Sequence, residues 1–161
     1  MNIYFLIALR FIHVVAGILW AGAAISYLFF VKPSVKSIGA AGPQFMQNLT
    51  QRRKYPIFMM STSLLTILAG GALFWIFSGR LNPAWMRTGM GMGITIGSIS
   101  GLAAFFIGAL IIGPTAGRMG ALGNQIAASG KAPTSNQISQ MHSLEKKLNL
   151  AENFEFTLFV I

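Results

Sequence analysis

The chain has 161 residues, of which 54% are hydrophobic and only 9% are charged. Soluble domains usually carry about 25% charged residues, so this composition argues against a soluble globular domain and indicates a membrane protein. The formal net charge is +9. Because the cations lie between apolar runs, we expect the lipid bilayer and its anionic headgroups as partners, and no nucleic acid. The chain has no cysteine, which excludes disulfides, thiolate-held iron–sulfur clusters and Cys-x-x-Cys-His haem attachment.

Three apolar runs are long enough to cross a bilayer core, which takes about 20 helical residues. We expect these spans over residues 3–31, 56–79 and 88–113. Lys32-Pro33 is expected to end the first span and Pro114 the third, because proline interrupts the hydrogen bonds of a helix.

A long polar segment follows the third span, and Pro133-Thr134-Ser135 within it is typical of a helix start. The residues after it keep apolar side chains at helical spacing. We interpret this segment as an amphipathic cytoplasmic helix that runs along the membrane surface into a fourth span; a solvated linker helix is the alternative. The fourth span, over residues 149–161, is expected to be incomplete, because its clean apolar run is far too short to cross a bilayer.

The sequence therefore predicts an all-α fold, an integral membrane four-helix bundle that forms a single domain over residues 1–161. Lysine and arginine set its orientation. The two longer loops carry nine of these cations, whereas the turn between the second and third spans carries only Arg80 and Arg87. By the positive-inside rule the longer loops are cytoplasmic and the N-terminus lies outside.

Glycine recurs at every fourth position of the third span, and Ala104 and Gly108 continue this line of small residues. Overlapping G-x-x-x-G steps let two backbones approach closely, which is a main source of helix association in lipid. We expect a tight helix–helix interface here, with the first span, the second span or another subunit as its partner. The four glycines are Gly89, Gly93, Gly97 and Gly101.

Arg10 and His13 lie one helical turn apart inside the first span, and Gly17 and Trp20 share their face. Ionisable residues in a membrane are costly, so they form a functional-site hypothesis. One interpretation is a haem b site, in which His13 ligates iron, a small residue makes room and Arg10 meets a propionate. In the alternative, His13 bonds a neighbouring helix and Arg10 extends outward to the interface.

Three methionines cluster at the outer end of the third span, near the expected level of His13: Met86, Met90 and Met92. Thioethers suit Cu(I), so a copper site made by His13 and these methionines is a further hypothesis. Methionine also fills gaps in apolar packing. His142 belongs to the cytoplasmic segment and cannot share one metal with His13, which leaves Met90 or Met92 as the second ligand within the chain.

No catalytic constellation is visible in the sequence: no Ser/His/Asp set, no H-E-x-x-H motif and no phosphate-binding glycine loop. Glu152 and Glu155 lie at the entry of the fourth span. We interpret them either as part of a proton path or as partners of Lys146 or Lys147. We expect no catalytic activity of the chain itself.

The segment from Leu9 to Gly22 (LRFIHVVAGILWAG) resembles the first span of small bacterial four-helix membrane proteins related to the CopD copper-resistance domain and to the DUF2269-like group. Ile112-Gly113-Pro114 with Arg118, and the segment from Leu144 to Leu150 (LEKKLNL), are similar to later segments of that group. The resemblance covers most of the chain. It implies a four-helix bundle in the bacterial inner membrane and, by analogy with haem-binding relatives such as HemJ, a ligand role for His13.

The leading hypothesis is a small accessory or structural subunit of a bacterial inner-membrane complex, with a redox or electron-transfer role for the complex. A haem- or copper-binding protein that uses His13 is the first alternative. A small copper or solute transporter is the second. Other membrane subunits are the expected protein partners.

Overall fold

The computed structural model describes residues 2–161, except for the side chain of Ala40, and it is helical throughout with short connections. No strand occurs among these residues, so the all-α prediction is confirmed. The elements are α1 (Ile3–Ser26), η1 (Tyr27–Val31), α2 (Lys32–Ser37), η2 (Gly39–Ala41), α3 (Gly42–Gln47), η3 (Asn48–Arg52), α4 (Tyr55–Phe77), α5 (Pro83–Met86), α6 (Gly89–Ile107), η4 (Gly108–Ile112), α7 (Gly113–Ser129) and α8 (Ser135–Val160).

Three helices are long and apolar enough to cross a membrane: Ile3–Ser37, Tyr55–Phe77 and Gly89–Ser129. The first joins α1, η1 and α2 without a break, and the third joins α6, η4 and α7. Large apolar side chains are exposed along them, such as Phe11 and Ile18 at 67% each. Such surfaces suit lipid contact and suggest a membrane protein.

Both long helices continue through a proline at which the sequence predicted an end. In each, a wide five-residue turn stands directly before the proline: Lys32 donates its N–H to the Tyr27 carbonyl, and Gly113 donates to Gly108. Proline has no N–H, and its ring clashes with the preceding turn of an ordinary helix. The wide turns η1 and η4 accommodate Pro33 and Pro114, so each helix extends well past its predicted end.

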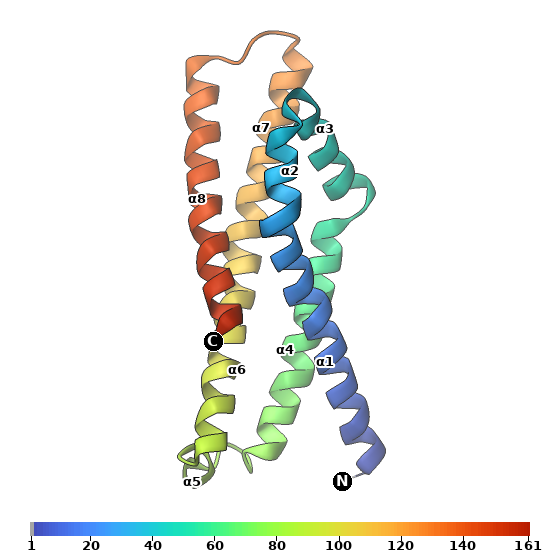
Figure 1. Ribbon diagram of the computed structural model, residues 1–161, viewed down its shortest axis with the longest axis vertical. Helices are drawn as coiled ribbons and strands as arrows, with labels where there is room; N and C mark the ends of the chain where they lie inside the picture. The colour runs from blue at the N-terminus through green and yellow to red at the C-terminus, as the bar shows by residue number, and fades with distance from the viewer. Residues whose placement is uncertain (1) are drawn as a thin grey trace.

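The polar segment after the third span forms a helical hairpin that runs along the long axis of the bundle. The sequence had predicted a helix along the membrane surface. Helix α7 ends at Gly130, which has a left-handed backbone (φ +62°), and α8 then runs back beside α7 and α6 (Figure 1). The predicted start of α8 is confirmed, because Thr134 and Gln137 form a capping box. Helix α8 continues from Ser135 to Val160, with no break between the amphipathic part and the predicted fourth span.

Figure 1 shows that the N-terminus and α5 lie at one end of the molecule, whereas α3 and the α7–α8 connection lie at the other. We call these the N-terminal end and the hairpin end. Helix α1 packs along α4, and α6 packs against both α4 and α8. Helix α8 ends before it reaches the N-terminal end, so it covers α6 only toward the hairpin end.

Candidate functional site

His13 lies between α1 and α4, where its imidazole makes one hydrogen bond. The distance from His13 Nδ1 to the carbonyl oxygen of Thr66 is 2.9 Å. Because a carbonyl only accepts, Nδ1 carries the proton of this hydrogen bond, which in the neutral tautomer leaves the lone pair on Nε2. The hydrogen bond to a neighbouring helix that the alternative interpretation predicts is therefore present.

Gly70 of α4 makes the space that the imidazole occupies. A Cβ at this position would lie 2.6 Å from His13 Cε1, so any side chain there would displace the ring. Gly17 of α1 faces α4 in the same way, with its hypothetical Cβ 3.6 Å from Thr66 Cγ2. Both glycines thus serve the contact between α1 and α4.

The other two residues predicted to share this face point to different surroundings. The Arg10 guanidinium lies 4.9 Å from the centre of the Phe77 ring, at the end of α4, and Arg10 is exposed. This is a cation–π contact at the N-terminal end. Trp20 is buried, and its ring stands edge-on to Phe159 of α8 at 5.1 Å.

The three methionines lie on elements that do not pack against α1. Met86 ends α5, and Met90 and Met92 begin α6, where their side chains are 73% and 50% exposed. The neighbours of α6 are α4, α5, η4 and α8. The structure thus brings His13 together with α4, and it does not bring these methionines to it. Among the described residues no group of three or more His, Asp or Glu side chains could hold a metal ion.

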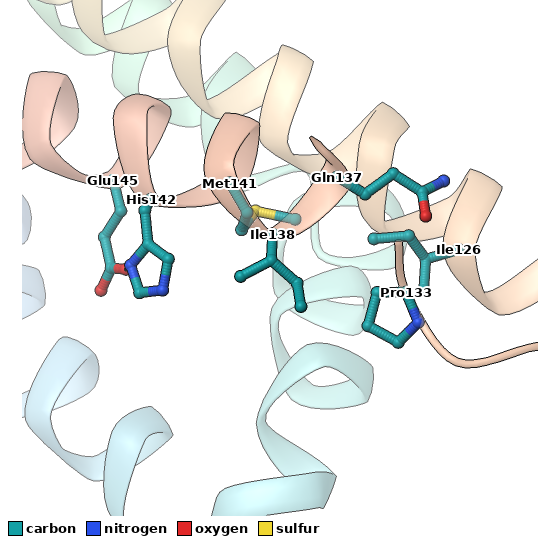
Figure 2. A pocket seen from close by; sticks show the side chains of 7 residues that line it. All are labelled: Ile126, Pro133, Gln137, Ile138, Met141, His142 and Glu145. Atoms are coloured by element: carbon teal, nitrogen blue, oxygen red, sulfur yellow. The ribbon is translucent and has the colours of Figure 1, made fainter. Parts of the chain in front are cut away.

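His142 belongs to a separate place, a shallow groove between α7 and α8 at the hairpin end (Figure 2). Ile126, Ile138 and Met141 line this groove, and His142 lies 4.0 Å from Glu145 at its margin. The His142 side chain is 76% exposed. His13 and His142 are therefore on different helices with different neighbours.

The glycines of α6 have two different surroundings. At Gly89, Gly93, Gly97 and Gly101 a Cβ would meet no described atom within 4 Å, and the first three are exposed. We call this the open glycine face. Further along the same line, Ala104 is fully buried, and Gly108 touches Glu155 of α8. Helix α8 thus covers one end of the line and leaves the other end bare.

Sequence reasoning missed a salt bridge that joins two distant parts of the chain. Lys32 of α2 forms a salt bridge with Glu152 of α8, although the two are far apart in the chain. Lys146 and Lys147, the expected partners of the glutamates, are exposed and form no ion pair among the described residues. One signal in the sequence pointed to a buried polar contact on α8: two of only three acidic residues lie three positions apart in an increasingly apolar segment.

Two tyrosines stand beside this salt bridge. The rings of Tyr27 and Tyr55 stack with centres 5.9 Å apart, and the Tyr55 hydroxyl donates to the Ala23 carbonyl over 3.0 Å. Aromatic residues with a polar tip are enriched where a membrane meets water. Lys32, Glu152 and the two tyrosines therefore have the composition of an interfacial layer.

Comparison of the chain with protein-family models, with curated proteins and with solved structures gave no match. The resemblance of the first span to the CopD-like and DUF2269-like group accordingly stays a prediction.

Proposed function

We propose that this chain is an integral subunit of a larger membrane complex and that it binds another membrane helix through the open glycine face of α6. One observation carries the proposal: the line of small residues is buried at Ala104 and lies against Glu155 of α8 at Gly108, while the same line from Gly89 to Gly101 has no neighbour among the described residues. In lipid, such faces associate through close backbone contact. We therefore expect a helix of another subunit to pack on the uncovered glycines, as α8 packs on Gly108.

The charge distribution supports a membrane orientation for this subunit. The N-terminal end carries Arg10, Arg80 and Arg87, whereas the nine other lysines and arginines lie toward the hairpin end. The positive-inside rule then places the hairpin end in the cytoplasm and the N-terminus outside. Helix α4, at 23 residues, matches the thickness of a bilayer with its flanks. The resemblance of the first span suggests the bacterial inner membrane and a redox role for the complex.

Substitution of a glycine in the open glycine face by a large residue tests this function. We expect Gly97→Leu to abolish co-purification of partner membrane proteins in mild detergent, because a leucine keeps two backbones apart. The isolated chain should keep its melting temperature, since nothing lies within 4 Å of that position. Gly71→Leu on α4 is the matched control, because its Cβ would also meet nothing. A wild-type chain that purifies as a stable monomer without partners would contradict the proposal.

The hydrogen bond of His13 favours a second candidate function, a haem b or copper centre. Ligating histidines usually donate their other ring N–H to a carbonyl or carboxylate, as His13 Nδ1 does to Thr66, and this leaves Nε2 as the ligand. His13 thus fits one coordination position of a metal or haem iron. Any further ligand would come from a residue outside the contact between α1 and α4.

An absorption spectrum of the purified protein, with metal analysis, tests this second candidate. A haem protein shows a Soret band that His13→Ala removes, and a copper protein shows bound copper that the same substitution lowers. The substitution His142→Ala is the control, because His142 lies in the hairpin groove. A featureless spectrum without bound metal would rule out both cofactors.

A further inference from the structure

Three polar residues follow one another on the face of α8 that turns toward the bundle: Asn149, Glu152 and Glu155. Glu152 is 7% exposed, and Lys32 neutralises it. Glu155 is equally buried at 7%, but no donor among the described residues forms a hydrogen bond with its carboxyl group. Burial of an unpaired carboxylate is unfavourable, so this position favours the uptake of a proton or the approach of a cation.

The backbone at Gly108, beside Glu155, offers no free N–H donor. Its Oε1 lies 3.1 Å from the position of a Cβ on Gly108, so the carboxyl group rests on the wide turn η4. The N–H of Gly108 already donates to Ala104 and Phe105, and Pro114, just beyond the turn, has no N–H. A carboxylate is acceptor-only, whereas a protonated carboxyl group has an O–H to donate. The surroundings therefore suit the protonated form.

No cation remains to neutralise Glu155 by pairing. On α8 its charged neighbour is Glu152, which carries the same charge and already holds Lys32. From α4 the titratable group that faces it is the hydroxyl of Tyr55, while the hydroxyl of Tyr27, in η1, faces Glu152. The segment from Gly89 to Ile112 contains no titratable residue at all, and Arg118 of α7 is exposed.

We propose that Glu155 is a proton-binding site inside the bundle, which exchanges its proton with water at the hairpin end. The carboxylate takes one proton from water and returns it to water, and no other bond changes. This inference rests on the contacts of α8 and is independent of the open glycine face.

The route to water lies along the same face of α8. Asn149 Oδ1 is buried without a hydrogen-bond partner, and an ordered water is the usual donor to such an atom. The Lys32 side chain is 31% exposed, so the salt bridge with Glu152 reaches the surface. Glu155 lies one helical turn deeper than this bridge. Protons thus reach Glu155 from the hairpin end, past Asn149 and Glu152.

Labelling of the full-length protein in liposomes with a hydrophobic carbodiimide, followed by mass spectrometry, tests the proposal. This reagent modifies protonated carboxyl groups in apolar surroundings. We expect modification of Glu155 at acidic pH, loss of that modification at alkaline pH, and no change when sodium is added at constant pH. Glu145 is the internal control, because its side chain is 51% exposed on the same helix. It should not be modified.

Infrared spectroscopy supplies a readout that needs no reagent. Each carboxyl group adds to the C=O band when the falling pH protonates it; the contribution of Glu155 should be missing in Glu155→Gln and remain in Glu145→Gln. Because the wild-type labelling requires no substitution, a variant that fails to fold leaves the test intact. Absence of labelling at every pH, or labelling that does not change with pH, would overturn the proposal. Protection of Glu155 by sodium would overturn the proposal, because it would show that the site binds a metal cation rather than a proton.

Discussion

The half of the bundle that contains α8 and the half beyond its end are held together in different ways. In the half with α8, helices meet through charged and aromatic side chains, such as Lys32 with Glu152 and Trp20 with Phe159. In the other half, α1 and α4 meet through small residues, with Gly17 and Gly70 at the contact and His13 as the polar link. The first half joins residues far apart in the chain, and the second joins two successive long helices.

This difference separates a part of the molecule in which helices cover one another from a part in which the open glycine face has no neighbour among the described residues. Buried charges tolerate little change, because removal of one leaves the other uncompensated. Glycine faces without a neighbour tolerate added methyl groups, because nothing is displaced. Substitutions of the same kind should therefore have large effects in one half and small effects in the other.

The largest loss of stability is expected from Lys32→Met. The substitution leaves Glu152, at 7% exposure, without its partner, and broken buried pairs cost about 3–5 kcal/mol. Since Lys32 itself is 31% exposed, we expect the lower part of that range. Thermal unfolding in mild detergent, followed by circular dichroism, measures the change.

Two further variants show whether the uncompensated charge is the cause. Lys36→Met removes an exposed lysine one turn further along α2 and should change the stability by less than about 0.5 kcal/mol. The double variant Lys32→Met/Glu152→Gln removes both charges and should recover much of the loss. A double variant no more stable than the single one would show that the charge of Glu152 is not what Lys32 compensates.

The sequence was sufficient for the parts of the fold that depend on local patterns. Apolar length identified the three helices that can cross a membrane, and Thr134 identified the start of α8. The predicted ends of the first and third long helices were wrong for a physical reason. Proline is incompatible with a regular α-helical turn, but the wide turns η1 and η4 absorb it, and no residue type announces such a turn.

The contacts of the candidate sites were less accessible to sequence reasoning. The sequence could predict that His13 bonds a neighbouring helix, but it could not predict the partner atom. Thr66 accepts with its backbone carbonyl rather than with its side chain. The salt bridge of Lys32 with Glu152 depends on α8 standing upright beside α1 and α2, which sequence spacing does not encode. Glycine spacing showed that α6 has a face for packing, but it could not show that only Ala104 and Gly108 are covered.

Alanine substitutions at the start of α6 should change the stability less, and in opposite directions at Gly91 and Gly93. A Cβ on Gly91 would lie 2.0 Å from the carbonyl oxygen of Trp85, which also accepts from the Thr88 hydroxyl at 2.7 Å. Gly91→Ala must therefore move the α5–α6 connection, at a cost of about 1–3 kcal/mol. Gly93→Ala meets nothing within 4 Å and should stabilise the helix by up to about 1 kcal/mol, because alanine favours helices over glycine. Melting temperatures of both variants in detergent measure this contrast; equal losses at the two positions would mean that the open glycine face is already occupied within the isolated protein.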